Sequence, residues 1–150
     1  MDAITLLKRD HREVKALFAE ADELGDRATT ARAKLFAKID EALTLHARIE
    51  EAVFYPAIKE KAKARSEERD DVLEAYEEHD VVKSLIKQLE ALDPSDEAYK
   101  AKLTVLKENV EHHVKEEESS LFKVARELLG EEELEQIGRQ IEAMKEKAAA

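Results

Sequence analysis

Residues 46–56 read HARIEEAVFYP and residues 113–123 read HVKEEESSLFK, and each stretch begins with a histidine followed four residues later by a glutamate. Both stretches lie where apolar residues recur every three or four positions, the spacing of an amphipathic helix. Side chains four residues apart on a helix project from the same face. Each stretch therefore predicts a histidine and a carboxylate side by side on one helix face.

The chain repeats this arrangement with a second element in front of it. Asp10–Leu17 aligns with Glu78–Leu85, and His46–Glu51 aligns with His113–Glu118. The offset between the two copies is 68 residues for the first match and 67 for the second. Each half of the chain thus carries one lone histidine followed by one His-x-x-x-Glu pair, which predicts two related helical hairpins.

The composition indicates long helices in a single domain. The chain has 150 residues, of which 41% are charged and 43% hydrophobic, with only three glycines and two prolines. The net charge of −11 argues against a nucleic-acid partner, because such proteins need a concentrated basic face. The absence of cysteine excludes disulfides and thiolate metal sites.

The apolar spacing sets the expected architecture. It predicts helices over residues 2–24, over 31–62, over a third segment carrying Val72 to Leu89, over a fourth that begins at Asp93–Asp96 and ends at Gly130, and over a short C-terminal segment, 131–147. Long helices with short connections fold most simply as an up-down-up-down four-helix bundle. We therefore expect an all-α fold in which residues 1–150 form one domain, with the bundle core over 2–129 and a short fifth helix after it.

Breaks between these helices are predicted from residue types. Gly25 is expected to cap the first helix in the left-handed conformation. Pro56 predicts a kink or a change of register just before it. Arg65–Arg69 is expected to be the next break, and Asp93–Asp96 to start the fourth helix with Pro94 at its first position.

The sequence predicts a soluble, cytoplasmic protein without a membrane partner. No apolar run approaches the ~20 residues needed to span a bilayer. The N-terminus, MDAITLLKRDH, lacks the apolar stretch of a signal peptide.

A buried functional site is predicted because the histidines lie on the apolar faces of their helices. Burying imidazoles and carboxylates without partners costs several kcal/mol each, so four helices that do so together predict a shared partner. The inward histidines and glutamates of the four helices can all meet at mid-bundle. They are His11, His46, Glu50, His79, His113 and Glu117. His112, Glu51, Glu116 and Glu118 point elsewhere and are expected to be solvated. The alternative for His112 is a contact with one of the metal ligands. The alternative is a metal-free helical bundle whose inner histidines are polar core residues.

The ligand types narrow the metal. Imidazole and carboxylate without thiolate suit iron, manganese or zinc. Two carboxylates shared among four helices fit an oxygen-bridged pair of metals. A single zinc ion would need only three protein ligands and would leave half of the set unexplained.

The combined pattern, with HARIEEAVFYP and HHVKEEESSLF around the pairs, resembles the hemerythrin-like (HHE cation-binding) domain family from about Leu6 to Val124. The resemblance implies two non-haem iron ions joined by an oxo or hydroxo bridge. It also implies bridging by Glu50 and Glu117, with the histidines divided between the two irons: His11 and His46 on one, His79 and His113 on the other.

The chain departs from the oxygen-carrying hemerythrins at one position. They place a further histidine one turn before the third-helix ligand, where this chain has Ala75. The nearby Tyr55 and Tyr76 are the candidate substitutes as metal ligands, and the alternative for both is core packing with a hydrogen-bonded hydroxyl.

The missing histidine argues against reversible oxygen carriage, and an open coordination position favours redox or peroxide chemistry. We expect a protein that binds O2 or reacts with peroxide or nitric oxide, with enzymatic activity an open question. The alternatives are an oxygen or iron sensing or storage module, and the metal-free bundle.

Overall fold

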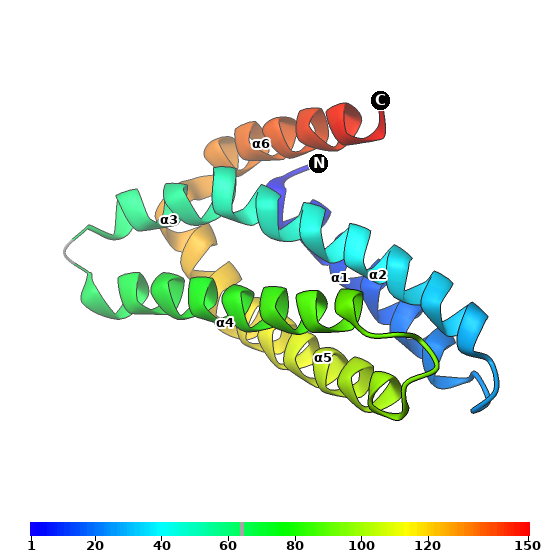
Figure 1. Cartoon of the computed structure of the whole chain (residues 1–150). Helices are drawn as coiled ribbons and strands as arrows, with labels where there is room; N and C mark the ends of the chain where they lie inside the picture. The colour runs from blue at the N-terminus through cyan, green and yellow to red at the C-terminus, as the bar shows by residue number, and fades with distance from the viewer. Residues whose placement is uncertain (64) are drawn as a thin grey trace.

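Helices account for every regular element in residues 1–63 and 65–150, which are the residues that the computed structural model describes (Figure 1). In chain order they are α1 (Ala3–Asp22), α2 (Thr29–Ile49), the π-helical η1 (Glu50–Phe54), α3 (Tyr55–Ala62), α4 (Ser66–Ala91), α5 (Glu97–Glu116), the π-helical η2 (Glu117–Leu121) and α6 (Phe122–Ala149). The all-helical fold predicted from the sequence is thus observed.

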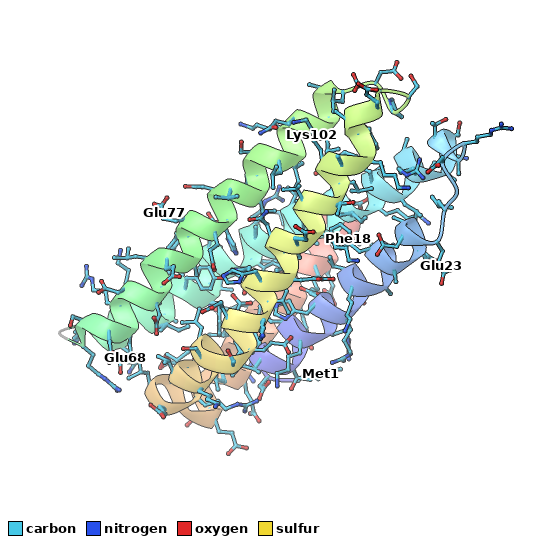
Figure 2. The ribbon with its side chains drawn as sticks, turned by 90° about the horizontal axis from the view of Figure 1, so that it is seen from below. Met1, Phe18, Glu23, Glu68, Glu77 and Lys102 are labelled. Atoms are coloured by element: carbon cyan, nitrogen blue, oxygen red, sulfur yellow. The ribbon has the colours of Figure 1, made fainter. Side chains whose placement is uncertain are left out.

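Sequence neighbours pair into two hairpins. The first hairpin packs α1 against α2, and the second packs α4 against α5. Elements η1 and α3 continue the line of α2, while α6 crosses back to pack on α1 and α3, so that the two termini lie close together on one side of the molecule (Figure 1). The apolar side chains of each hairpin face the other hairpin. Phe18, labelled in Figure 2, is one of them and is only 2% exposed.

Two apolar clusters fill the interior at different levels. One contains Phe18, Ile39, Leu106 and their neighbours near the hairpin loops. The other contains Ile4, Phe54 and their neighbours near the termini. The predicted histidines lie in sequence between the members of the two clusters on each helix, so a polar layer divides the apolar core.

A wider, π-helical turn joins α2 to α3, and another joins α5 to α6. Pro56 predicted a change of register just before it. The structure has η1 there, and α3, which contains Pro56, follows directly. The repeat equivalent η2 was not predicted, and it forms although Lys123 stands where the first copy has Pro56. Proline is therefore not the cause that the two turns share. Both begin at the glutamate of a His-x-x-x-Glu pair, a position where π turns often accompany functional residues.

Three predicted breaks were wrong in detail. Gly25 is not in the left-handed region, because α1 ends in tight backbone bonds and the Gly25 carbonyl accepts from the buried Arg32 guanidinium at 2.8 Å. Residues 66–69 are helical, since acids suit the first turn of α4. The fourth helix begins at Glu97 with Asp96 as its cap, while Asp93 accepts from Ser95 and holds Pro94 in the loop.

The last helix is interrupted where the sequence predicted an end. Gly130 has φ 77° and ψ 169°, which is not helical, and the chain then turns to run past the N-terminus. Leu134, Ile137 and Ile141 bury their side chains in the cluster near the termini. Among the helices described, none is long and apolar enough to cross a membrane.

Candidate metal centre

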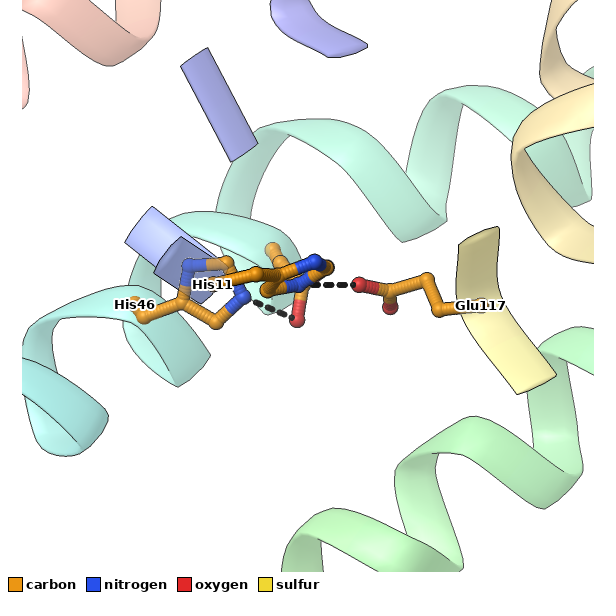
Figure 3. A group of neighbouring side chains, drawn as sticks. His11, His46 and Glu117 are labelled. Atoms are coloured by element: carbon orange, nitrogen blue, oxygen red, sulfur yellow. Dashed lines mark ion pairs between the residues drawn. The ribbon is translucent and has the colours of Figure 1, made fainter. Parts of the chain in front are cut away.

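Six buried polar side chains meet in the layer between the two apolar clusters. They are the six predicted at sequence level: His11, His46, Glu50, His79, His113 and Glu117. The histidines come from α1, α2, α4 and α5, and the glutamates begin η1 and η2. Figure 3 shows His11, His46 and Glu117 pointing toward one another.

The Nε2 atoms of all four histidines face the two carboxylates. His46 Nε2 and His79 Nε2 each lie 3.1 Å from Glu50 Oε1. His11 Nε2 lies 3.1 Å from Glu117 Oε1, and His113 Nε2 lies 3.3 Å from Glu117 Oε2. Each carboxylate therefore contacts one histidine from each hairpin.

These donor atoms form two groups that share a carboxylate. One group is His11, His46, Glu50 and Glu117, and the other is Glu50, His79 and His113. Within each group, one ligand atom per residue lies within 4.8 Å of the others. Two adjacent groups of imidazole and carboxylate are an arrangement that can hold two cations side by side.

Unpaired donor atoms test whether the residues fit a metal. His11 Nε2, His46 Nε2, Glu50 Oε2 and Glu117 Oε1 are buried and make no well-directed hydrogen bond with the described residues, although each of the two nitrogens lies 3.1 Å from a carboxylate oxygen. Buried polar atoms are rarely left unpaired, since each costs about 1–3 kcal/mol. All four converge on the same space, so the residues present fit cations bound between them.

The register of the fourth helix follows from exposure. The side chains of His113 and Glu117 are 9% and 0% exposed, whereas those of His112 and Glu116 are 64% and 54% exposed. The two pairs have identical spacing, and only the first points into the polar layer.

Known proteins place this arrangement in a family. Residues 2–125 match the model of the hemerythrin HHE cation-binding domain, which covers most of the chain. The chain belongs to the hemerythrin HHE cation-binding domain family.

Two relatives extend the comparison. The structure superposes on the crystal structure of a hemerythrin HHE cation-binding domain-containing protein from Mycobacterium kansasii, with a TM-score of 0.82 and 26% identity over 97% of this chain and 86% of that one. A curated protein from Nostoc sp. (strain PCC 7120 / SAG 25.82 / UTEX 2576), named DNA nickase, is 32% identical over 147 residues. Those residues are 98% of this chain but only 40% of that relative.

Tyr55 brings a hydroxyl into the HHE centre. By this name we mean the six buried side chains His11, His46, Glu50, His79, His113 and Glu117. The oxygen of Tyr55 lies 3.2 Å from His79 Nε2 and 3.3 Å from His113 Nε2. The hydroxyl also donates to Glu117 and lies 3.1 Å from Glu50 Oε1. Burial, and then the charges of Glu50 and Glu117, raise the pKa of Tyr55 well above its ordinary value. Without a cation, the phenol therefore keeps its proton.

Tyr76 does not reach the donor atoms of this HHE centre. Its ring packs edge-on against Tyr55 with centroids 5.3 Å apart, and no hydrogen bond joins its hydroxyl to a described residue of the centre. Ala75 is buried in the neighbouring apolar cluster. The two tyrosines that the sequence proposed together thus occupy different environments.

The two halves of the HHE centre differ at one aromatic residue. Tyr55 and Phe122 occupy equivalent places in the repeat, each directly after a π-helical turn. Phe122 stacks on His11 with centroids 5.8 Å apart and planes 2° from parallel, whereas Tyr55 turns its hydroxyl toward His79 and His113. The sequence repeat contained this asymmetry as a tyrosine opposite a phenylalanine.

Charge within the HHE centre is strongly coupled. Burial lowers the pKa of His46, but the charge of Glu50, the hydrogen bond to Asp10 and the close contact of Glu50 outweigh it and raise that pKa to about 10. Burial likewise lowers the pKa of His113, and hydrogen bonds to Glu117, Glu50 and Glu78 raise it to about 12. Without a cation, these two imidazoles are therefore protonated at neutral pH.

Sequence reasoning missed an outer ring of carboxylates. Glu51 and Glu118, which were predicted to be solvated, are part-buried and contact the Nδ1 atoms of His79 and His11. Asp10 and Glu78 contact the Nδ1 atoms of His46 and His113 in the same way. The available signal was their place beside the ligands in both copies of the repeat.

A cavity of about 340 Å³ opens beside the HHE centre. The four histidines line it on one side, and Val14, Leu43, Val82, Ile86 and Val110 are among its apolar walls. Exposed side chains such as Lys87 and Glu90 also line it, so small molecules have a route from solvent to the polar layer.

Proposed function

We propose that this domain holds two non-haem iron ions bridged by oxygen, and that it binds O2 or reacts with peroxide or nitric oxide at them. The observation that carries the proposal is the convergence of four imidazole Nε2 atoms and two carboxylates on one space, where four of their atoms lack a well-directed hydrogen bond. Membership of a cation-binding family supports the same conclusion.

The ligand assignment that we propose follows the two groups of donor atoms. His11 and His46 would hold one iron, and His79 and His113 the other. Glu50 and Glu117 would bridge them, which is supported by the contact of each carboxylate with one histidine from each hairpin. The fold that we propose around this site is an up-down-up-down four-helix bundle, with the segment after Gly130 as a short fifth helix.

We further propose Tyr55 as a ligand on the His79 side, in place of the histidine that Ala75 replaces. Its hydroxyl lies within 3.3 Å of both histidine Nε2 atoms there. A bound ferric ion would favour loss of the phenol proton, and Glu117 accepts a hydrogen bond from that hydroxyl. Tyr76 was predicted beside Tyr55 and lacks such contacts, so it serves as the comparison residue.

Bound iron would supply an electron source and an open coordination position. The residues that line the cavity determine which small molecules reach the iron. The apolar walls of the cavity favour small, weakly polar molecules such as O2 and NO, and its opening also admits a peroxide.

The proposed reactivity is tested by mixing the iron-loaded, reduced domain with each small molecule. We expect a change in visible absorption with O2 or NO, and O2 evolution or peroxide consumption with hydrogen peroxide. Consumption of peroxide or NO with turnover would identify an enzyme, whereas stoichiometric binding would identify a carrier or a sensing and storage module. No reaction of the iron-loaded domain with any of the three would refute the proposal.

The name of the Nostoc relative raises DNA nicking as a second candidate. The matched region is 40% of that relative, and the net charge of −11 disfavours a phosphate-backbone substrate. We therefore expect supercoiled plasmid to stay intact with the iron-loaded domain. Conversion to open circles, lost in a His113→Ala variant, would establish the nicking function instead.

A further inference from the structure

Every histidine of the centre has a carboxylate on its outer nitrogen. The Nδ1 atoms of His11 and His46 lie 2.6 Å from Glu118 Oε2 and 2.8 Å from Asp10 Oδ2. Those of His79 and His113 each lie 2.7 Å from a carboxylate oxygen, of Glu51 and Glu78 respectively. Because a carboxylate only accepts, each Nδ1–H is the donor.

The four contacts follow the internal repeat. Asp10 and Glu78 directly precede the lone histidines, and each contacts the paired histidine of its own hairpin. Glu51 and Glu118 directly follow the inward glutamates, and each reaches the lone histidine of the opposite hairpin. The same chemistry in both copies, across different helix pairs, is unlike the scattered ion pairs of a charged surface.

The contacts fix which nitrogen faces the centre. A neutral imidazole whose Nδ1–H is held by a carboxylate presents its Nε2 lone pair, and all four Nε2 atoms point inward, where a cation that displaces the remaining protons would meet them. A carboxylate there also makes the imidazole a stronger ligand. Four negative charges around a buried cation pair further favour the more positive oxidation state of that pair.

We propose that Asp10, Glu51, Glu78 and Glu118 are positioning residues that fix the histidine tautomers and lower the reduction potential of the iron pair. The inference rests on the proposed iron centre and goes beyond its ligands. Two of the four are themselves held in place, since Lys145 contacts Asp10 and Lys83 lies 2.9 Å from Glu51.

Two pairs of variants separate the role of charge from that of the hydrogen bond. In Glu118→Gln and Glu78→Gln the amide oxygen still accepts from Nδ1–H, but the charge is gone. In Glu118→Ala and Glu78→Ala both are lost. Glu116→Gln and Glu77→Gln are the controls, because they remove the same charge from exposed neighbouring positions.

The measurements are the midpoint potential of the iron pair, followed optically during titration, and the apparent Fe²⁺ affinity in competition with a chelator. We expect the glutamine variants to shift the potential to more positive values, with iron content near that of the wild type. The alanine variants should weaken iron binding roughly 10–100-fold. Circular dichroism of each metal-free variant checks that the helices are intact, which the part-exposed positions of Glu78 and Glu118 favour.

Three results would contradict the inference. If Glu118 and Glu78 variants match their controls in potential and affinity, the positioning role is wrong. If the controls shift as much as the variants, overall charge is responsible and the inference also fails. If the wild-type chain takes up no iron, the proposed function fails first, and the inference falls with it.

Discussion

At the scale of single residues, the two halves of the centre differ by one oxygen atom. Tyr55 directs a hydroxyl at His79 and His113, while its repeat equivalent Phe122 stacks on His11. The sequence repeat placed an aromatic residue after each π-helical turn, but it could not show which ring edge faces the histidines. That depends on packing between α3 and α4.

Tyr55→Phe tests whether the hydroxyl is a ligand. We expect the ferric protein to lose a visible tyrosinate-to-iron charge-transfer band while keeping both irons, because six other ligands remain. Tyr76→Phe removes a hydroxyl that makes no contact with the centre, and it should leave the band unchanged. A band that survives Tyr55→Phe would assign that hydroxyl to packing alone.

The shifted pairs on the fourth helix test the register. His113→Ala and Glu117→Ala each remove a buried donor and should lower iron content by half or more. His112→Ala and Glu116→Ala remove exposed side chains at the same spacing and should leave it nearly unchanged. Elemental analysis measures all four. Loss of iron only in the His112 pair would move the inner face of the helix by one residue.

Sequence periodicity predicted the ligand positions better than their surroundings. The apolar stripe and the repeat located six side chains that the structure brings together. They could not locate Glu51 and Glu118, because a charged residue beside an inward glutamate also fits a solvated surface. Only the wider π-helical turn and the neighbouring hairpin bring these two side chains to a histidine.

At the scale of elements, helices were easier to predict than their ends. The 3.6-residue spacing identified the segments, whereas the ends depend on local hydrogen bonds that the spacing does not encode. At Gly25 the relevant bond comes from the buried Arg32, seven residues further along the chain. At Asp93–Asp96 the side chain of Asp93 folds back onto Ser95 and delays the helix.

Substitution of the two glycines in α6 tests whether this helix turns and packs on the N-terminus as the structure shows. Gly130→Ala should destabilise the fold by roughly 1–3 kcal/mol, because φ 77° with ψ 169° is a conformation that glycine alone adopts readily. Gly138→Ala should also destabilise, since its Cβ would lie 2.2 Å from the Met1 carbonyl oxygen. Urea unfolding measures both.

Gly25→Ala is the control for these two. It has open space around it and no positive φ, so its effect should stay within about 0.5 kcal/mol. Unchanged stability in Gly130→Ala would mean that the turn inside α6 at Gly130 is not held in this conformation.

At the scale of the whole molecule, the polar layer links folding, protons and metal. The hairpins bring four imidazoles and two inner carboxylates between two apolar clusters. Without a cation, the protonated imidazoles of His46 and His113 pair with the carboxylates, and they must give up those protons when a cation binds. The sequence predicted that these groups meet, but their protonation depends on distances that only the fold provides.

The stabilisation by iron should therefore grow with pH. The raised pKa values of His46 and His113, about 10 and about 12, mean that their ion pairs stabilise the metal-free fold fully below pH 6.5. That contribution is lost as the pH rises toward those values. Burial raises the pKa of Glu50, but His46 and the other histidines lower it well below 4.5, so its share is lost only in acid.

Iron binding needs the unprotonated imidazoles, so it strengthens over the same rise in pH. We expect the difference in melting temperature between iron-loaded and metal-free protein to be larger at about pH 8 than at about pH 6. Calorimetry at both values measures it. A constant or shrinking difference would show that His46 and His113 are not protonated in the metal-free centre.

The iron stoichiometry of the purified chain, reconstituted with ferrous iron, tests the central claim most directly. Elemental analysis should give two irons per chain, and X-ray absorption should place them roughly 3.5–4 Å apart, as in other oxygen-bridged pairs. A single zinc ion per chain, or no bound metal after reconstitution, would contradict the di-iron centre.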